Sequence, residues 1–254
     1  MSTLYIVGTP IGNLEDISLR ALRILNEVDF ILCEDTRVTG KLLRHYRIKT
    51  PTISYHQHSD DAKLMYITGL IAQGKNLALV ADAGTPGISD PGGKLVRAVI
   101  EKLGDQAKIE SVPGPSAVTA ALSISGIPTD KFVFMGFPPH KKGRQTFLGK
   151  IVKSEFPVVV YESKHRIIKF LEELAAINRL IEKRNKEIDA EISRGLASKK
   201  ETEAKKQPVT SVVVARELSK MHETVYRGEI ETIIKRILEN QDEQKGEFTV
   251  VIGK

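Results

Sequence analysis

The residues best suited to acid–base chemistry directly follow an apolar stretch, Phe30–Cys33. Here Glu34, Asp35, Thr36 and Arg37 place two carboxyl groups, a hydroxyl and a guanidinium side by side. The apolar stretch predicts a buried strand, and open α/β sheets keep their sites at the carboxyl ends of strands. Glu34, Asp35 and Arg37 are therefore candidates for orienting a hydroxyl or removing its proton. A structural alternative is equally good: Asp35 or Thr36 caps a helix, and Arg37 forms a surface ion pair.

A second polar segment, residues 56–61, follows the strand-like stretch Thr52–Tyr55. It contains His56 and His58 beside two aspartates. Residues at i and i+2 share one face of an extended chain, but no third ligand follows at a spacing familiar from metal sites. The segment therefore favours polar contact with a substrate or partner over a metal site. His56 joins the candidates for proton transfer.

The most unusual loop is residues 81–93, between the apolar run Leu77–Val80 and an amphipathic segment. Its sequence is Ala-Asp-Ala-Gly-Thr-Pro-Gly-Ile-Ser-Asp-Pro-Gly-Gly. Its glycines permit unusual backbone torsions and let another molecule approach the main chain, and its prolines restrict the rest. A plain connection between a strand and a helix needs only about two to six residues. The loop is therefore predicted to bind a ligand.

Two further glycine–proline loops follow apolar stretches. Gly8–Asn13 comes after Leu4–Val7, and Pro113–Ala117 follows another strand-like stretch. The first loop lacks the dinucleotide fingerprint because Pro10 replaces its second glycine, and the chain contains no Walker pattern. In the second loop, Pro115 suits the first turn of a helix, whose free N–H groups either contact a ligand or simply end a structural turn.

The second half repeats the alternation of strands and helices. Residues 131–137 and 156–162 are predicted to be strands, and between them lies a basic loop, His140–Arg144. Its cations, Lys141, Lys142 and Arg144, suit phosphate groups, although a solvated surface run explains them nearly as well. The turn after the second strand adds Lys164 and Arg166, further candidates for contact with phosphate.

Residues 176–207 are highly charged and predict a protruding helix to about Arg194, followed by a flexible linker. Strands are predicted again at 209–214, 224–229 and 247–252. Apolar spacing also predicts helices, one of which carries Leu19, Leu22 and Leu25 on one face. Alternating strands and helices of this kind predict two sequential α/β domains, residues 1–118 and 119–254.

Composition sets the class of protein. The chain has 254 residues, of which 41% are hydrophobic, and it carries a formal charge of +6, which suits a polyanionic partner such as RNA. Its single cysteine, Cys33, cannot form an internal disulfide and fits a buried strand better than a nucleophile. The start of the chain lacks a basic signal region, and no apolar run approaches the roughly 18 residues of a spanning helix. We therefore expect a cytoplasmic protein.

Five motifs, in this order, resemble the bacterial 16S ribosomal RNA 2′-O-methyltransferase I family within the tetrapyrrole methylase superfamily. The motifs are Val7–Leu14, Cys33–Arg37, Ala83–Gly92, Pro113–Ala117 and Ala215–Leu218. The resemblance implies two α/β domains with S-adenosylmethionine bound between them, and a homodimer. It also implies methylation of a cytidine ribose 2′-hydroxyl in the decoding region of 16S ribosomal RNA, within the small subunit.

The resemblance also implies which residues bind the cofactor. In the first domain they are Pro10, Gly84, Thr85, Pro86, Ile88, Ser116 and Ala117, and in the second they are Tyr161 and Ala215. Corrin and porphyrin methylases have an acidic residue where this chain has Thr85, which favours the ribosomal branch. A methylase of a tetrapyrrole or other small molecule, and a non-catalytic RNA-binding module, are the alternatives.

The chain also differs from many members of this family after its last predicted strand. The chain ends shortly after its last predicted strand, where many relatives carry a short helical extension. We therefore expect RNA binding to depend more strongly on the charged 176–207 segment and on the basic loop than it does in relatives that carry the extension.

Overall fold

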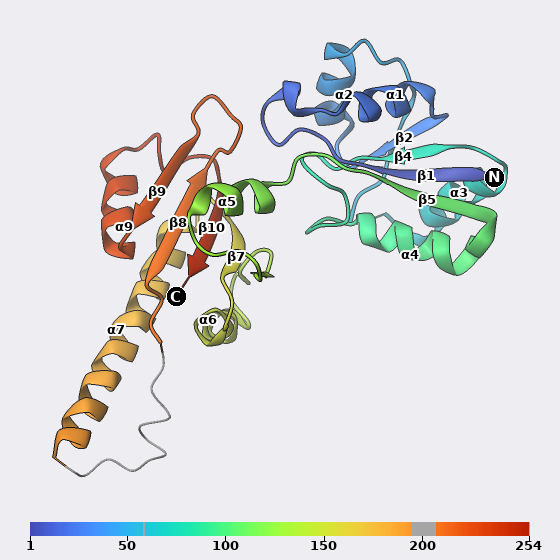
Figure 1. Ribbon diagram of the computed structural model, residues 1–254. Coiled ribbons are helices and arrows are strands. Elements are labelled where there is room, and N and C mark those ends of the chain that lie inside the picture. Colours follow the sequence, from blue (N-terminus) through green and yellow to red (C-terminus); the bar gives the residue numbers. More distant parts are fainter. Residues whose placement is uncertain (58, 195–206, 254) are drawn as a thin grey trace. The chain divides into compact units, whose positions relative to one another are not determined.

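A computed structural model describes residues 1–57, 59–194 and 207–253. The chain divides into two compact units, Met1–Ala117 and Val118–Lys254. Each unit combines a five-stranded sheet with α-helices (Figure 1). The prediction of two sequential α/β units is confirmed. His58 and the predicted linker at 195–206 lie outside the described residues.

The first unit is built on a parallel sheet with strand order β3-β2-β4-β1-β5. Its strands are β1 (Ser2–Val7), β2 (Phe30–Cys33), β3 (Thr52–Ser54), β4 (Leu77–Leu79) and β5 (Ala107–Val112). All five overlap stretches that the sequence predicts to be strands. Because the strands are parallel, the glycine-rich loops and the polar segments that follow them emerge at one edge of the sheet.

Helices cover both faces of this sheet (Figure 1). They are α1 (Leu19–Glu27), α2 (Thr36–His45), α3 (Asp61–Ala72) and α4 (Gly92–Leu103), with short 3₁₀ turns at Leu14–Asp16 and Gly104–Gln106. Side chains of α1 and α2 pack with Val7, Ile31 and Ala78 on one face. Those of α3 and α4 pack with Leu4 and Leu77 on the other.

In the first helix, the buried face differs by part of a turn from the face formed by Leu19, Leu22 and Leu25 that the sequence predicts. Leu19 is 85% exposed, whereas Ala21, Ile24 and Leu25 are buried. The buried residues follow the i, i+3, i+4 spacing of an α-helix. Ser18 accepts a hydrogen bond from the Ala21 N–H at 3.1 Å and thereby begins the helix. Leu19 is therefore the first helical residue, and its side chain lies in solvent.

The second unit contains a mixed sheet with strand order β6-β7-β10-β8-β9. Its strands are β6 (Val133–Phe134), β7 (Val158–Ser163), β8 (Ser211–Arg216), β9 (Thr224–Gly228) and β10 (Glu247–Gly253). Only β6 and β7 pair in parallel. The predicted strand at 131–137 is reduced to two residues. It ends near Gly136, whose φ of 65° does not fit a strand.

In the described part of this unit, the helices are α5 (Ala117–Ser125), α6 (Arg144–Lys153), α7 (Ile167–Ser193) and α9 (Ile230–Glu239). Side chains of α6, α7 and α9 form one core with those of the sheet. The charged helix predicted from residue 176 is the second half of α7, which is continuous through residue 193. No helix in the part of the chain that the structure describes is long and apolar enough to cross a membrane.

Two glycines let the first and last loops of the parallel sheet touch. The Gly8 N–H donates to the Val112 carbonyl at 3.0 Å. A Cβ at Gly8 would lie 2.8 Å from the Cα of Gly114, and a Cβ at Gly114 would lie equally close to the carbonyl of Gly8. Both positions therefore require glycine, and the reason is close packing of two backbones.

We expect Gly8→Ala to lower the free energy of unfolding by about 1–3 kcal/mol, the usual cost of overpacking a rigid site. Urea denaturation followed by circular dichroism measures the change. Gly40→Ala is the matched control, because Gly40 lies within α2 and an added Cβ there meets nothing within 4 Å. That change should stabilise the helix by about 0.5–1 kcal/mol. Equal effects at both positions would contradict the packing argument.

Candidate active site

A backbone bridge joins the loop after β1 to the loop after β4. The Thr9 N–H donates to the Gly84 carbonyl at 2.9 Å, and the Gly84 N–H donates back to the Thr9 carbonyl at 3.1 Å. The Thr9 hydroxyl lies 3.2 Å from the Ala81 carbonyl, to which it donates, and 3.3 Å from that of Gly84. Thr9 is almost fully buried. Two loops that are far apart in the sequence are thus fixed at the carboxyl edge of the sheet.

Gly84 is a further position where the backbone favours glycine. Its φ is +78°, and a Cβ there would lie 3.4 Å from the Ile11 side chain and 3.6 Å from the Pro115 carbonyl. The loops after β1, β4 and β5 therefore converge around Gly84. This convergence brings together residues that the sequence assigned to a cofactor from three separate stretches.

Asp90 fixes the rest of the loop after β4. One of its carboxylate oxygens, Oδ1, accepts hydrogen bonds from the N–H groups of Gly87 and Gly92, both at 2.7 Å. A Cβ on Gly92 would lie 2.8 Å from the Gly87 nitrogen and 2.9 Å from this Asp90 oxygen. Sequence reasoning missed Asp90. Its position two residues before a glycine that begins a helix is the signal that could have identified it.

The predicted cofactor residues of this unit differ in exposure. Gly84 and Pro86 are buried, and Pro10, Thr85, Ser116 and Ala117 are half-buried. Ile88 leaves 49% of its surface exposed, so its apolar side chain is open to contact with a ligand. The edge of the sheet therefore offers buried backbone, half-buried small side chains and one open apolar contact.

Acidic side chains gather at the end of β2. Asp82, from the loop after β4, accepts a hydrogen bond from the Asp35 N–H at 3.1 Å. Burial raises the pKa of Glu34, and the negative charges of Asp82 and Asp90 raise it further, while His56 opposes them. The structure thus places Glu34 in the field of both aspartates and of His56. Neither Asp82 nor Asp90 was identified from the sequence.

Asp35 and Arg37 adopt the structural alternative. The Asp35 carboxylate accepts from the Arg37 N–H at 2.8 Å, so it caps α2, and it also pairs with the Arg37 guanidinium at 2.7 Å. These bonds lower the pKa of Asp35 to about 2. The Arg37 side chain is 88% exposed. Capping leaves Asp35 ionised and oriented, and it leaves the outer face of Arg37 open.

We expect Glu34→Gln to raise the stability of the protein at pH 7. A carboxyl whose folded pKa is raised destabilises the fold when it ionises, and this cost is absent below its usual pKa of 4.5. The variant should therefore exceed the parent in urea midpoint at pH 7, and the difference should vanish below pH 4.5. A variant that is less stable at pH 7 would show that the Glu34 carboxylate is favourably paired instead.

In the second unit, Tyr161 lies among aromatic rings. Its ring centroid is 5.0 Å from that of Phe134 and 5.4 Å from that of Phe137. Burial raises the pKa of Tyr161, and a backbone hydrogen bond with Val118 opposes the shift. Ala215, the other predicted cofactor residue of this unit, is buried in β8. Its side chain adds no polar group, so only its backbone and its small size are available to a ligand.

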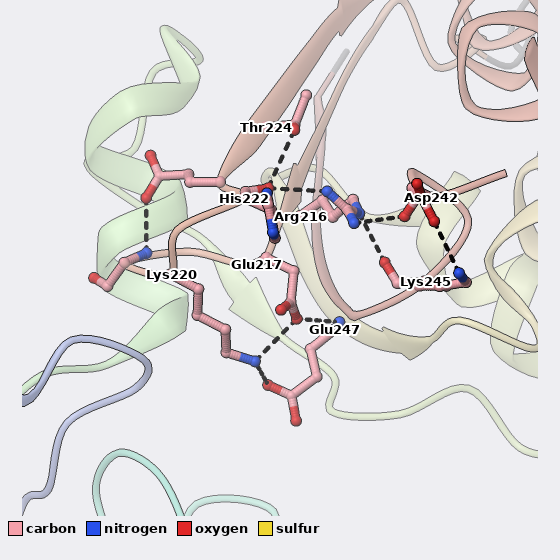
Figure 2. Close-up of polar contacts among 10 residues, drawn as sticks. Arg216, Glu217, Lys220, His222, Thr224, Asp242, Lys245 and Glu247 are labelled. Atoms are coloured by element: carbon pink, nitrogen blue, oxygen red, sulfur yellow. Dashed lines mark hydrogen bonds and ion pairs between the residues drawn. The ribbon is translucent and has the colours of Figure 1, made fainter. Parts of the chain in front are cut away.

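The residue after Ala215 is a buried arginine that binds three carbonyl oxygens (Figure 2). The Arg216 guanidinium donates to the backbone of Asp242 at 2.6 Å, Lys245 at 2.7 Å and His222 at 2.9 Å. These carbonyls belong to the loop before β10 and to the turn between β8 and β9. Arg216 therefore joins two loops to the end of the strand that carries Ala215.

Next to Arg216, a chain of ion pairs joins Lys220 to two glutamates (Figure 2). The Lys220 ammonium lies 2.9 Å from both Glu217 and Glu247. Glu217 has a φ of +52°, and its carboxylate also accepts from the Glu247 N–H at 2.8 Å. A Cβ on Gly246 would overlap the Glu217 side chain. The strained backbone at Glu217 is thus held by Lys220 and by the space at Gly246.

Arg216→Met should lower the free energy of unfolding. Leaving one buried acceptor without a partner costs about 1–3 kcal/mol, and Arg216 binds three of them. The control is Arg184→Met, which removes an exposed ion pair with Glu187 and should change stability by less than about 1 kcal/mol. Urea midpoints of the two variants measure the difference. An unchanged midpoint in Arg216→Met would mean that water replaces the guanidinium at all three carbonyls.

The predicted RNA contacts divide into two groups. Lys141, Lys142 and Lys164 are exposed, as phosphate contact requires. Arg144 is only 5% exposed, and its guanidinium bonds Glu173 at 2.6 Å. The assignment of Arg144 to RNA is wrong, because burial against a carboxylate satisfies its charge within the fold. Arg166 is largely buried as well, so its charge is also directed inward.

Comparison with known proteins identifies the family. Residues 3–234 match the tetrapyrrole (corrin/porphyrin) methylases. The chain is 41% identical to the ribosomal RNA small subunit methyltransferase I of a Synechocystis species, over all of this chain and 79% of that protein. It is 38% identical to the protein of the same name from Thermotoga maritima, over 100% and 99% of the two chains. The chain belongs to the ribosomal RNA small subunit methyltransferase I family. Membership makes it a methyltransferase.

Solved structures extend the likeness to the whole fold. A uroporphyrin-III-C-methyltransferase from Thermus thermophilus matches with a TM-score of 0.61 and 18% identity, over 100% of this chain and 95% of that one. The methyltransferase CobJ matches with a TM-score of 0.62 and 16% identity, over the same shares. At such low identity the likeness concerns the fold alone. The methyltransferase I family thus shares its two-domain architecture with tetrapyrrole methylases.

Proposed function

We propose that this protein transfers a methyl group from S-adenosylmethionine to a cytidine ribose 2′-hydroxyl of 16S ribosomal RNA, in the decoding region. The observation that supports it most strongly is the 41% identity, over the full chain, to a ribosomal RNA small subunit methyltransferase I. Thr85 supports the proposal further, because the corresponding loop of corrin and porphyrin methylases has an acidic residue at the position of Thr85. A tetrapyrrole or other small-molecule methylase is the alternative.

The loops at the carboxyl edge of the first sheet fit the cofactor. The open Ile88 side chain suits an apolar part of the donor, and the half-buried Pro10 and Thr85 offer surfaces beside it. Gly84 leaves its backbone free of a Cβ. Pro86, Ser116 and Ala117 complete this group in the first unit, with Tyr161 and Ala215 proposed from the second. Bound S-adenosylmethionine supplies a methyl group that its sulfonium already activates.

The side chains then have two tasks, to orient the 2′-hydroxyl and to accept its proton. Glu34 is the best acceptor, because its raised pKa brings a carboxylate nearer to the basicity that general-base catalysis uses. His56 acts electrostatically on the same carboxylate and partly offsets the rise in its pKa. Asp35 and Arg37 form an ion pair directly after Glu34, at the end of β2. The exposed Arg37 guanidinium is available for contact with RNA. Holding the reacting atoms in line supplies much of the rate.

The proposed partners follow from the same assignment. Lys141, Lys142 and Lys164 present exposed cations for ribosomal RNA within the small subunit. A homodimer and a cytoplasmic location are part of the proposal, and they rest on the family resemblance. The decisive experiment is mass spectrometry of 16S RNA from cells with and without the gene. One ribose methyl group on a cytidine should disappear with the gene, and an unchanged pattern would overturn the proposal.

We expect Ile88→Ala to weaken S-adenosylmethionine binding without affecting the fold. The side chain is half exposed, so its removal leaves no cavity, but it deletes apolar contact worth about 1–2 kcal/mol if fully covered. Gly84→Val should abolish binding, since its Cβ is strained at a φ of +78°. Calorimetry measures both affinities, and circular dichroism checks the fold. Unchanged affinity in Ile88→Ala would move the cofactor away from this loop.

Arg37→Ala should lower the rate of methyl transfer to isolated small subunits while leaving S-adenosylmethionine affinity unchanged. The guanidinium is 88% exposed, so its loss should cost the fold little. Asp35→Ala should lower the rate as well, and it should also lower the free energy of unfolding, because it removes a helix cap. Labelled methyl incorporation measures the rates. Normal rates in both variants would restrict these residues to the structural role.

A further inference from the structure

Residues 137–143, which form most of the loop between β6 and α6, are fixed from one side by two guanidinium groups. Arg166 donates to the Pro138 carbonyl at 3.0 Å, and Arg144 donates to the Pro139 carbonyl at 3.1 Å. Pro138 is buried. Two successive carbonyl groups are thus held by two different side chains, so the loop has little conformational freedom.

A buried carboxylate organises the two arginines. Glu162, only 1% exposed, lies 2.8 Å from the Arg166 guanidinium and 3.9 Å from that of Arg144. Burial raises the pKa of Glu162, and the Ser163 N–H and both arginines oppose the shift. Buried ion networks add little net stability, since desolvation offsets the attraction. Fixing the shape of the loop is the contribution that an apolar core could not make.

The outer side of the same loop presents an aromatic ring and cations. Phe137 is 49% exposed, and its ring packs on that of Tyr161 at 5.4 Å. His140, Lys141 and Lys142 follow in the loop, all exposed, and residues 137–143 contain no acid. A flat apolar group that covers the exposed part of this ring would remove apolar surface from water and stack on it. Phe137 shares this loop with two exposed lysines that form no ion pair with any of the residues that the structure describes. The loop therefore suits a ligand that has both flat apolar surfaces and negative charge.

We propose that Phe137 is a stacking platform for an unpaired base of the substrate RNA, and that Lys141 and Lys142 bind phosphates of the same strand. The proposal rests on the proposed RNA substrate and deepens it. Single-stranded RNA is the polymer that offers exposed base faces together with a charged backbone, and its recognition commonly uses aromatic stacking. Bases within a duplex already stack on one another, so an unpaired segment is the form that this loop binds.

The test uses the full chain and two probes: an unstructured pyrimidine oligoribonucleotide and isolated small ribosomal subunits. Fluorescence anisotropy should show that Phe137→Ala binds the oligonucleotide about 5- to 150-fold more weakly, because stacking contributes about 1–3 kcal/mol per base. Phe137→Trp should restore affinity. Phe156→Ala is the control, since Phe156 is 40% exposed but precedes the amino end of β7, whereas Phe137 packs on Tyr161 near its carboxyl end.

Salt dependence separates the two kinds of contact. Removing both lysines, Lys141→Ala with Lys142→Ala, should reduce the slope of log affinity against log salt by about 1.4, because each phosphate contact on a single strand contributes about 0.7. Phe137→Ala should leave the slope unchanged, because stacking releases no counterions.

The outcomes also separate this proposal from the assigned function. If the parent binds and methylates RNA but Phe137→Ala binds as the parent does, the stacking role is overturned and the function stands. If the parent itself fails to bind or methylate RNA, the function is wrong. If Phe137→Ala dissociates a dimer in sedimentation while each chain binds the oligonucleotide normally, the ring belongs to an interface between two copies. Calorimetry with S-adenosylmethionine should give the parent's affinity for every variant.

Discussion

The candidate site depends on the contact between the loops that leave β1, β4 and β5. The paired backbones of Thr9 and Gly84, and the touching backbones of Gly8 and Gly114, bring those loops within van der Waals distance. No side chain intervenes at either contact, so the arrangement tolerates little change. Backbone groups that pair with one another also need no water, which lets the loops lie against each other at the edge of the sheet.

The second unit uses buried arginines for a related purpose. Arg216 binds three carbonyl oxygens, whereas Arg144 and Arg166 bind carbonyls on one side and carboxylates on the other. A guanidinium suits this role because its planar donors point in several fixed directions. In each case the guanidinium group donates hydrogen bonds that hold irregular backbone in place. The loop that contains Phe137 and the loops next to the end of β8 are therefore held by several side-chain hydrogen bonds.

The edge of the first sheet combines these rigid loops with an acidic environment around Glu34. Asp82 and Asp90 both support the backbone, the first at the end of β2 and the second within its own loop. Their charges also raise the pKa of Glu34. Residues that fix the shape of the loops therefore also set the basicity of the group proposed to accept a proton. Shape and chemistry are coupled here through the same carboxylates.

Most strands, their alternation with helices and the glycine-rich loops could be predicted from local patterns, because apolar periodicity and glycine or proline content are properties of short segments. The five motifs that resemble the family are local as well. The roles of the charged residues became clear from the folded chain alone. The sequence did not distinguish Arg144 from Lys141, yet Arg144 is buried and pairs with the Glu173 carboxylate, whereas Lys141 lies in solvent. Burial depends on contacts between distant segments, such as α6 with α7, and no local pattern records those contacts.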